Sequence, residues 1–511
     1  MITPLDILSL ETWILIGTIL ALLRYYIHRK WQVLKQLGIP HDPPTLLNLG
    51  NLVPAMKNFQ QFFLNDVKNK KKFGKVYGTY VFLKSRITIW DTDVLQQIYI
   101  KEFSTFSDRK ASSNLLNGEV MKNQLVSVSG PKWKRIRNTL TPYFSTSKLK
   151  GMYGTVEKCV ELMVKQIKKT SEENDGKIDV KEVFGRMAMD SICAAAFGVD
   201  THIQETGKDL KLIEMVKKIF DLQRTFNIWF ILTIIFPWFE KVLRFFNYSV
   251  YPKGTIEYFV VLTDAIKEKS QTGSTDRVDF MRLMLQSEIS EQESKQENAK
   301  GITQNEITAN SITMILAGYD TTSSTILFLA YNLAAHKDVQ QKLRQEIQDT
   351  VQEYGGLTYE GLNSMKYLTM CINESQRLYP AVPVNSRHCS EEIIMNGITI
   401  PKGVTIIIPM YGLAHDEEYW EEPMKFKPER MEDMNKIDPM IFQPFGGGPR
   451  NCIGMRFALI VVKLTICNVL QNFYLDFADD TPEPPLETIF RASVRPKVDV
   501  LSLKLTPIDT E

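Results

Sequence analysis

Cysteine is scarce in this sequence, and its scarcity excludes several kinds of site. The chain has 511 residues and six cysteines, which lie far apart. None of them belongs to a CxxC pair or a CxxCH segment, so zinc ribbons, iron–sulfur runs and covalently attached c-type haem are excluded. The histidines include no HExxH, which excludes a zincin. Six cysteines are also too few to form a disulfide scaffold.

The sequence also has no marked excess of positive or negative charge. Lysine and arginine number 61, aspartate and glutamate 59, and the formal net charge is +2. This balance argues against a general nucleic-acid binder. With 44% hydrophobic and 23% charged residues, the composition is typical of a globular protein. No internal repeat divides the chain, and mainly helical patterning between residues 132 and 380 favours one large, mostly helical domain with small sheets.

One hydrophobic run is long enough to cross a bilayer. Residues 7–26 would span roughly 30 Å as a helix, which is the thickness of a bilayer core. Acidic residues precede the run, and basic residues follow it at positions 24 and 28–30, so the rest of the chain is expected on the cytoplasmic side. No basic n-region or small-residue cleavage site is present. We predict an uncleaved anchor at residues 1–30; the alternative is an amphipathic or buried helix.

A proline-rich stretch follows the anchor. Pro40, Pro43 and Pro44 fix their own φ angles and disfavour helix in the residues before them. We therefore predict a stiff hinge at residues 31–55 that sets the angle between the anchor and a body at residues 56–511.

A second apolar run, at residues 228–239, is too short to span a membrane and contains Pro237. It is either a buried helix or a surface loop that dips into the membrane, with Trp229 and Trp238 at the interface. Asn247 begins a glycosylation sequon, which the predicted topology keeps on the cytoplasmic side.

Short strands are expected where β-branched and aromatic residues gather. The pattern predicts strands at residues 76–82 and 86–90, joined by a turn at residues 84–85. It also predicts strands at residues 393–400 and 405–408.

The chemistry of the chain is concentrated in residues 445–454, FGGGPRNCIG. The glycines do not cradle a phosphate, because no Gly-Lys-Ser/Thr follows and the GxGxxG spacing fails. The loop instead delivers Cys452 to the start of an apolar helix that begins at Met455. A helix N-terminus favours thiolate over thiol. The glycines allow the backbone to approach a flat ligand closely, and Arg450 offers a cation to carboxylates of that ligand.

This segment resembles the haem-thiolate signature of the cytochrome P-450 family, Phe-x-x-Gly-x-Arg-x-Cys-x-Gly. All five fixed positions are present, at Phe445, Gly448, Arg450, Cys452 and Gly454. The resemblance implies the cytochrome P-450 fold, mainly α with small β-sheets, as a single large haem domain behind the anchor. It also implies that Cys452 is the axial thiolate ligand of the iron of haem b, with Phe445 and Arg450 beside the cofactor.

A second motif is Glu-x-x-Arg at Glu374 and Arg377. A spacing of three places both residues on one face of a helix. Alone, such a pair is an ordinary surface ion pair. In the family it binds the arginine of a Pro-Glu-Arg segment, here Arg430, and the resemblance implies that the three residues fasten the haem-proximal core.

The third motif, residues 317–322 (AGYDTT), lies in a predicted long helix that begins with a capping box of Thr303 and Glu306. Gly318 inside this helix costs up to about 1 kcal/mol relative to alanine. It is explained either by close helix packing or by a groove for a small ligand. In the family, residues in the positions of Asp320 and Thr321 provide an acid and a hydroxyl that pass protons to bound oxygen.

Several arginines resemble the family's haem-propionate contacts. Trp133 and Arg137, in Trp-x-x-x-Arg, match the pair on one helix, and Arg387 matches an arginine after the Glu-x-x-Arg helix. Arg109 matches a further propionate arginine by local similarity alone. For each of them the alternative is a solvated arginine on the surface.

The resemblance implies a monooxygenase that inserts one oxygen atom of O2 into a lipophilic substrate. Residues 438–458 resemble the microsomal branch that metabolises drugs and steroids. The chain shows no nucleotide fingerprint and no flavin domain, so electrons from NADPH would come through a separate membrane-bound flavoprotein reductase, with cytochrome b5 as a further partner. The implied location is the endoplasmic reticulum membrane, with a single span and the catalytic domain in the cytoplasm.

A basic cluster could meet an acidic redox partner, although an ordinary solvated helix face is the alternative. Its members are Lys132, Lys134, Arg135, Arg137, Lys148 and Lys150. The family also places the substrate wall at residues 110–130, 311–321, 381–384 and 489–490, which are mostly apolar and favour a steroid, fatty acid, terpenoid or xenobiotic.

Two other functions compete with the monooxygenase. One is a haem-thiolate isomerase that rearranges peroxides without a reductase, and the other is a non-catalytic haem sensor or carrier. Relatives with isomerase activity typically have an altered acid–alcohol pair, so the intact Asp320 and Thr321 favour the monooxygenase.

Overall fold

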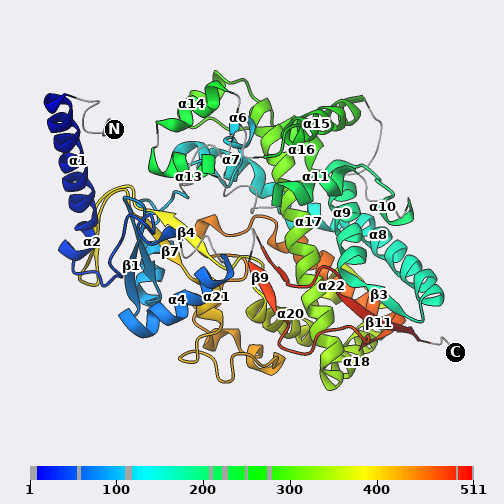
Figure 1. Cartoon of the computed structure of the whole chain (residues 1–511). Coiled ribbons are helices and arrows are strands. Elements are labelled where there is room, and N and C mark those ends of the chain that lie inside the picture. The colour runs from blue at the N-terminus through cyan, green and yellow to red at the C-terminus, as the bar shows by residue number, and fades with distance from the viewer. Residues whose placement is uncertain are drawn as a thin grey trace, which may run out of the picture.

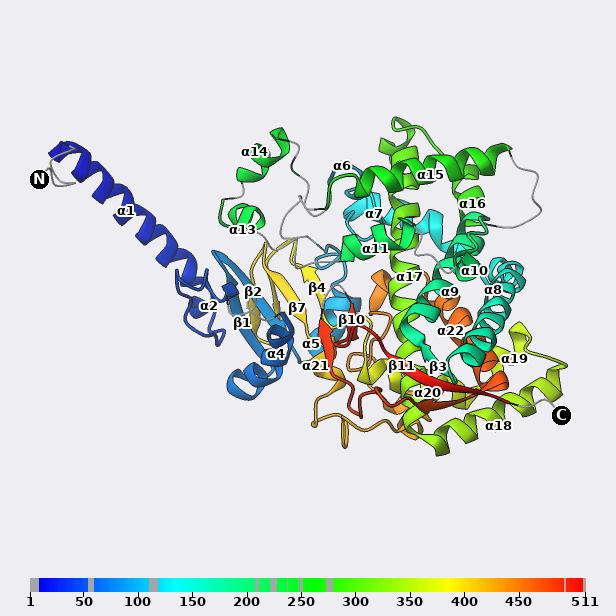
Figure 2. The same ribbon diagram turned by 45° about the vertical axis from the view of Figure 1, so that its right-hand side comes forward.

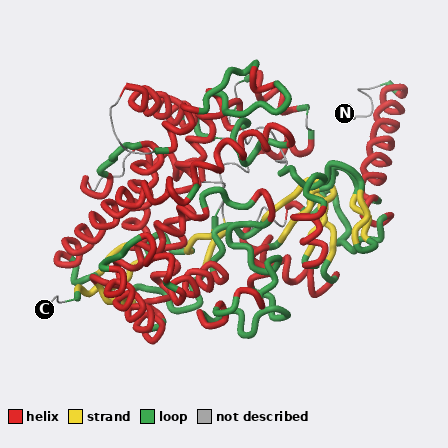
Figure 3. Tube along the Cα trace, turned by 180° about the vertical axis from the view of Figure 1, so that it is seen from behind, coloured by secondary structure: helices red, strands yellow, loops and turns green. Residues whose placement is uncertain are grey.

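The computed structural model describes residues 9–53, 59–109, 118–206, 211–220, 228–236, 238–246, 248, 251–272, 279–490 and 493–508. Figure 1 shows a large helical body beside a smaller sheet region, with the N-terminal helix projecting from the sheet side. Seen from behind in Figure 3, helices fill most of the body, and strands gather toward the N-terminal helix and near the C-terminus. The expected fold class, mainly helical with small sheets, is confirmed.

Helices make up most of the body. The long ones are α1 (Leu10–Trp31), α4 (Phe59–Phe73), α7 (Gly130–Leu140), α8 (Thr146–Glu173), α9 (Val180–Phe197), α11 (Lys211–Phe220), α15 (Thr255–Thr272), α17 (Gln304–Ala335), α18 (Lys337–Tyr354), α20 (Lys366–Leu378) and α22 (Met455–Asn472). The shorter ones are α2 (Val33–Gln36), α5 (Thr92–Gln96), α6 (Gly118–Met121), α10 (Ile203–Thr206), α13 (Ile228–Ile235), α14 (Phe239–Phe245), α16 (Phe280–Gln286), α19 (Tyr359–Ser364) and α21 (Met410–Ala414).

The central helix is α17, which packs against α9, α15, α20 and α22 and runs through the middle of the body in Figures 1 and 2. Its start is stabilised as the sequence predicts, because the backbone N–H of Thr303 donates to the Glu306 carboxylate at 2.9 Å. This helix carries the third sequence motif into the core.

Strands form small sheets. One sheet has the order β1 (Val76–Val81), β2 (Lys84–Ile89), β7 (Thr405–Ile408), β4 (Asn385–His388), and another has the order β3 (Lys177–Asp179), β11 (Ser502–Pro507), β8 (Phe473–Phe477). Two hairpins pair β5 (Ile393–Met395) with β6 (Ile398–Ile400) and β9 (Thr488–Phe490) with β10 (Val494–Pro496). The parallel pairing of β2 with β7 brings together segments that are more than 300 residues apart in the sequence.

Two details of the strand prediction are wrong. Lys84 and Ser85 are not in the turn, because they pair with Val81 and Tyr80. The turn lies two residues earlier, at residues 82–83, where Phe82 adopts a φ of 53°. The predicted strand at residues 393–400 is a hairpin, since Asn396 and Gly397 have φ angles of 47° and 76° and reverse the chain. Asn-Gly between apolar runs is a strong hairpin signal, so this turn was predictable.

The segment after α1 is fastened to the first sheet. The indole N–H of Trp31 donates to the carbonyl of Phe82 at 2.8 Å, and the Tyr80 hydroxyl donates to the carbonyl of Trp31 at 2.9 Å. Further along, the Gly78 N–H donates to the carbonyl of Pro40 at 2.8 Å. These contacts fix the direction in which α1 leaves the sheet (Figure 2). The domain boundaries at residues 30 and 55 stay predictions.

Among the described residues, three helices are long and apolar enough to cross a membrane. Of the most apolar windows of α17 and α22, 56% and 61% are buried inside the protein, whereas only 6% of the window of α1 is buried. Packing in the core therefore accounts for the apolar character of α17 and α22. The apolar surface of α1, in contrast, is not packed against other described residues.

Candidate functional site

The loop at residues 445–454 folds tightly against a neighbouring turn before α22 begins. The backbone N–H of Cys452 donates to the carbonyl of Phe445 at 2.8 Å, which closes the loop. Gly448 has a φ of 67°, and a Cβ at this position would overlap the carbonyl oxygen of Tyr99. Glycine is therefore required here both by conformation and by space. The cysteine loop packs against Tyr99, and no motif in the sequence indicates this contact.

Cys452 is accessible, yet the surrounding protein raises the pKa of its thiol through burial. Both observations hold because the sulfur is recessed rather than on the outer surface. The N–H groups of Gly454 and Met455 and the guanidinium groups of Arg137 and Arg109 act in the opposite direction and lower this pKa. The helix start thus acts as the sequence predicts, although burial outweighs it.

Two predicted residues on α7 hold the cysteine loop. Trp133 is buried, and the guanidinium of Arg450 lies 4.6 Å from the centre of its ring, within cation–π range. Arg137, one turn further, donates to the backbone carbonyl and side-chain oxygen of Asn451 at 3.0 and 2.8 Å. Neither residue is a solvated surface group, since both contact the segment that precedes Cys452.

The other predicted arginines reach the same loop from different segments. Arg109 donates to the carbonyl of Arg450 at 3.1 Å. Arg387, on β4, is 1% exposed; it donates to the side-chain oxygen of Asn385 at 3.0 Å and lies 4.7 Å from the centre of the Tyr99 ring. The surface alternative is therefore wrong for Arg109 and Arg387 as well.

We call Arg109, Arg137, Arg387 and Arg450 the arginine cluster. Burial lowers the pKa of each, and Arg109 further lowers the pKa of the other three by charge repulsion. In the described part of the chain, Asp108 is the one carboxylate ion-paired with the cluster, 4.0 Å from Arg450. Buried positive charge of this kind is costly unless anions pair with it.

Three members of the arginine cluster also have unused hydrogen-bonding capacity. The Nε groups of Arg109, Arg387 and Arg450 are buried and have no hydrogen-bond partner among the described residues. Buried donors without partners destabilise a protein, so this arrangement fits a ligand that brings carboxylates. Haem b carries two propionates, and Cys452 is the donor that would bind its iron. The residues present therefore fit haem b.

The face of α17 that carries Thr321 is open. Ala317 is exposed although most of this helix is buried, and the Thr321 hydroxyl donates to the Ala317 carbonyl at 2.8 Å. Gly318 has a different explanation: a Cβ there would lie 2.8 Å from the side chain of Ile192 on α9. Of the two explanations offered for Gly318, close helix packing is therefore the one that the structure supports.

Asp320 does not face the same way as Thr321. It is 5% exposed, and its two carboxylate oxygens are bound by the guanidinium of Arg495 and the hydroxyl of Ser493. The proton role of Asp320 and Thr321 stays a prediction; in this structure the two side chains are bonded to different partners. The sequence did not reveal the partners of Asp320, because 173 and 175 residues separate them from it.

The Glu-x-x-Arg motif forms a fully buried ion pair. Glu374 and Arg377 are both 0% exposed, and Arg377 binds both carboxylate oxygens, at 2.8 and 2.9 Å. Arg430 donates to the same carboxylate at 2.9 Å, as the resemblance implies. We call Glu374, Arg377 and Arg430 the glutamate staple.

Comparison with known proteins agrees with this geometry. A family model for cytochrome P450 matches residues 40–501. The chain belongs to the cytochrome P450 family. Cytochrome P450 3A31 of Mesocricetus auratus is 37% identical over 510 residues, covering 99% of this chain and 98% of the relative. Cytochrome P450 3A5 of Homo sapiens is 37% identical over 481 residues, covering 93% of each chain.

Membership of the family identifies the chemistry. This P450 is a haem-thiolate monooxygenase that uses haem b with a cysteine thiolate as the iron ligand. A redox partner and a lipophilic substrate follow in general terms. The isomerase and the non-catalytic haem carrier are not favoured.

The basic cluster expected to meet the redox partner is smaller in the structure. Arg135 is almost fully buried and pairs with Glu306 at 2.6 Å, and Arg137 turns inward to Asn451. Both are therefore wrong as docking residues, because their charges are already used inside the protein. Lys132, Lys134 and Lys150 are exposed, and Lys148 is half-buried.

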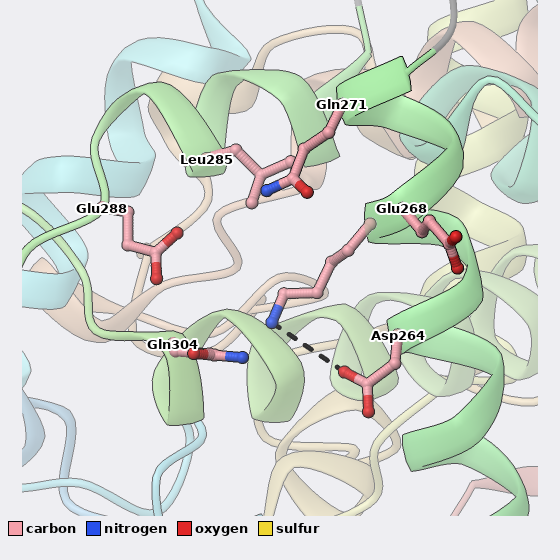
Figure 4. A pocket seen from close by; sticks show the side chains of 7 residues that line it. Asp264, Glu268, Gln271, Leu285, Glu288 and Gln304 are labelled. Carbon is pink, nitrogen blue, oxygen red and sulfur yellow. Dashed lines mark ion pairs between the residues drawn. The ribbon is translucent and has the colours of Figure 1, made fainter.

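Two cavities lie away from the cysteine loop. The first, of about 280 Å³ between α15, α16 and the start of α17, is lined mainly by polar residues, among them Asp264, Glu268 and Glu288 (Figure 4). Asp264 forms an ion pair at 3.9 Å with Lys267, three residues further along the same helix. The acidic lining of this cavity suits no lipophilic substrate. The second, of about 1020 Å³, is lined by residues of α13, α14 and α15 and of the segment before α15.

The apolar run at residues 228–239 contributes to this second cavity and to the surface. Trp229 lines the cavity and is 46% exposed, while Trp238 is 62% exposed. The run is a helix over Ile228–Ile235, as the first alternative has it, but this helix is partly exposed rather than buried, and the surface loop of the second alternative is not formed there. Residues 110–117 of the expected substrate wall and the sequon residue Asn247 lie outside the described residues.

Proposed function

We propose that this P450 oxidises lipophilic molecules at a haem held by Cys452 and the arginine cluster. The single observation that carries the proposal is the gathering of four arginines at the loop that presents Cys452. Arg387 and Arg450 are buried, Arg109 and Arg137 are half-buried, and the Nε groups of Arg109, Arg387 and Arg450 have no partner among the described residues. When bound, haem b supplies the activation of O2 and the oxidation of the substrate. The protein holds the cofactor, positions the substrate and controls protons.

Each residue of the site has a separate task in this proposal. Arg387 and Arg450 would hold the propionates of the haem, and Arg137 keeps the cysteine loop in place through Asn451. Phe445 and Trp133 would contribute to the cofactor site. Thr321, on the open face of α17, holds a proton or an ordered water through its hydroxyl, and Asp320 delivers protons to it from the protein side.

Electrons reach the site from an NADPH-dependent flavoprotein reductase, with cytochrome b5 as a second donor. Exposed Lys134 supports an acidic partner surface most directly, because the exposed Lys132 and Lys150 already pair with Glu306 and Glu360. Replacing Lys134 with glutamate should slow reductase-supported turnover and weaken its salt dependence, while turnover driven by an organic peroxide stays the same. Equal loss with both oxidants would contradict this docking role.

The substrate class follows from the relatives and from the surface. The relatives are cytochromes P450 of the 3A group, and we propose that this chain is a microsomal enzyme of the same drug- and steroid-metabolising kind. Its α1 anchors it by a single span to the endoplasmic reticulum membrane, with the catalytic body in the cytoplasm. The exposed aromatic residues Trp229, Trp238 and Phe246 then contact the bilayer, from which lipophilic substrates enter.

The proposal is tested with the full chain in phospholipid vesicles, supplied with reductase, NADPH, isotopically labelled O2 and a panel of steroids, fatty acids, terpenoids and drugs. We expect labelled oxygen in at least one product, in proportion to NADPH consumed. Conversion of lipid peroxides without reductase would indicate an isomerase instead. A haem-loaded chain that oxidises no compound would indicate a carrier.

The proton role of Thr321 is tested separately. Thr321→Ala should divert electrons from product to hydrogen peroxide and leave haem content unchanged, because the hydroxyl lies outside the arginine cluster. The measurement is the ratio of peroxide to product per NADPH. An unchanged ratio would remove Thr321 from proton delivery.

A further inference from the structure

Asp320 is held by two residues that the proposed mechanism does not yet use. Arg495 and Ser493 each bind one oxygen of its carboxylate, and Arg495 also donates through Nε to the Ser493 hydroxyl at 3.3 Å. The three side chains therefore form one connected group, which we call the Asp320 latch. The carboxylate is 5% exposed, so water competes little for it.

The Asp320 latch joins the central helix to elements around the expected substrate wall. In the β9–β10 hairpin, Arg495 stands directly opposite Ile489, which belongs to that wall. The neighbouring Val494 donates its N–H to the carbonyl of Ala381 at 3.1 Å, and Ala381 belongs to the wall as well. Figure 2 shows β10 beside α17. A substrate that moves the hairpin must therefore move Arg495.

Arg495 also contacts the end of α11. Its guanidinium lies 5.5 Å from the centre of the Phe220 ring, within cation–π range. The positive charge of Arg495 also acts on Lys181 of α9. Burial lowers the pKa of Lys181 most, and repulsion by Arg495 lowers it further. The guanidinium is thus surrounded by a repelling lysine, an aromatic ring and one carboxylate, and Asp320 is the partner that favours its present position.

The geometry conflicts with immediate proton delivery. Asp320 directs its carboxylate toward β10, and the hydroxyl of Thr321 is bonded to the carbonyl of Ala317. A carboxylate whose two oxygens are bound elsewhere cannot pass a proton toward Thr321 until one of these bonds opens. The neighbouring positions of the two residues in the sequence therefore do not by themselves make a relay.

We propose that Arg495 and Ser493 are positioning residues that hold Asp320 away from Thr321 until substrate displaces the β9–β10 hairpin. The latch rests on the proposed proton role of Asp320 and adds a control to it. With the latch closed, the enzyme without substrate reduces little O2. With the latch open, Asp320 turns toward Thr321 and protons reach the site.

The test uses the full chain with reductase in vesicles and no added substrate. Arg495→Gln should raise NADPH consumption several-fold, and the ratio of NADPH to O2 should rise toward two, because reduction of O2 to water consumes two NADPH and two protons from solution. Arg495→Lys should stay near the wild-type rate, since it keeps the charge. An unchanged rate in Arg495→Gln would overturn the proposal.

A double variant shows whether Arg495 acts through Asp320. Asp320→Asn combined with Arg495→Gln should consume NADPH at the low rate of Asp320→Asn alone. A persistent high rate in the double variant would mean that protons do not pass through Asp320, and the latch would be refuted. The matched control is Lys497→Gln, which removes an exposed ion pair with Glu487 from the same hairpin and should leave consumption unchanged.

A second readout does not depend on turnover. Hydrogen exchange of the Val494 amide should quicken several-fold in Arg495→Gln and also in the wild type when a substrate binds, because both release the hairpin from α17. If neither Arg495→Gln nor substrate binding changed the exchange rate of the Val494 amide, the proposed link between Arg495 and the position of the hairpin would be contradicted. Failure of the proposed function has a different signature, namely no oxygenated product from any compound, and is therefore separable from failure of the latch.

Discussion

The glutamate staple and the arginine cluster are both buried groups of charge, but they differ in how their charges are satisfied. In the glutamate staple, one carboxylate receives Arg377, Arg430 and the backbone N–H of Lys427. The remaining N–H groups of Arg377 donate to backbone carbonyls, including those of Ala414 and Pro423 at 2.8 Å. The hydrogen bonds of Glu374 and Arg377 are therefore satisfied within the chain, although one carboxylate faces two guanidinium groups.

The arginine cluster is incomplete. Its guanidinium groups lower one another's pKa by repulsion, and three of its Nε groups lack partners among the described residues. A buried charge network that is satisfied within the protein is costly to break, whereas an unsatisfied one indicates a ligand of opposite charge. The comparison separates a structural motif from a binding site although both consist of arginines.

The largest effect is expected for Glu374→Gln. The substitution leaves Arg377 and Arg430 without their anion in a fully buried place, which should lower the free energy of unfolding by about 3–5 kcal/mol. Urea unfolding of the haem-loaded chain, followed by circular dichroism, measures it, and little folded protein should accumulate on expression. A loss below about 1 kcal/mol would show that the two regions do not differ as argued.

Arg387→Met should weaken haem retention strongly and fold stability only slightly, the reverse of Glu374→Gln. Haem should dissociate roughly 10- to 100-fold faster, because a hydrogen bond between charged groups is worth about 1.5–3 kcal/mol. Thermal stability before haem loss should fall little, since a repelling charge has also gone. Transfer of haem to apomyoglobin measures the rate. Arg344→Met is the matched control, because Arg344 is also buried and donates to the Phe473 carbonyl at 3.2 Å. If Arg344→Met also released haem faster, haem retention would not depend specifically on the arginine cluster.

Gly448→Ala should disturb the cysteine loop by an intermediate amount. The positive φ alone costs roughly 1–2 kcal/mol, and the added methyl group would also overlap the carbonyl of Tyr99. Gly403→Ala should lose stability through the positive φ alone, because φ is 88° there and no atom lies within 4 Å of the new methyl group. Melting temperatures of the two variants measure the difference. Equal losses would mean that Tyr99 does not support the loop.

The smallest effect is expected for Glu429→Gln. Glu429 neighbours Arg430 in the sequence, but its ion pair with Lys342 at 3.0 Å joins two side chains that are each more than half exposed. Exposed pairs contribute about 0–1 kcal/mol. The free energy of unfolding in urea should therefore differ little from that of the wild type. A loss as large as that of Glu374→Gln would contradict the claim that buried ion pairs contribute more than exposed ones.

The sequence predicted those parts of the site that are carried by local motifs. The cysteine loop, the Glu374–Arg377 pair and the capping box at Thr303 each occupy a few consecutive residues, so spacing reveals them; that the pair is buried and binds Arg430 was implied only by the family resemblance. The arginine cluster was predicted through family resemblance, because its members lie in four separate segments and have no local pattern in common.

Contacts between distant segments were not predictable from one sequence. Tyr99 supports the cysteine loop through its backbone carbonyl, and a backbone contact leaves no signature in the side chain. Ser493 and Arg495 meet Asp320 only because the β9–β10 hairpin packs on α17. Likewise, Arg135 looked like a surface residue until the structure paired it with Glu306.

The central claim is that the sulfur of Cys452 is the axial ligand of the haem iron. The most direct measurement is the absorption spectrum of the reduced carbon monoxide adduct, recorded for the wild type and for Cys452→Ala. The account predicts the red-shifted band of thiolate coordination in the wild type and its absence in the variant. Survival of that band in Cys452→Ala, or a wild-type spectrum typical of imidazole coordination, would contradict the account.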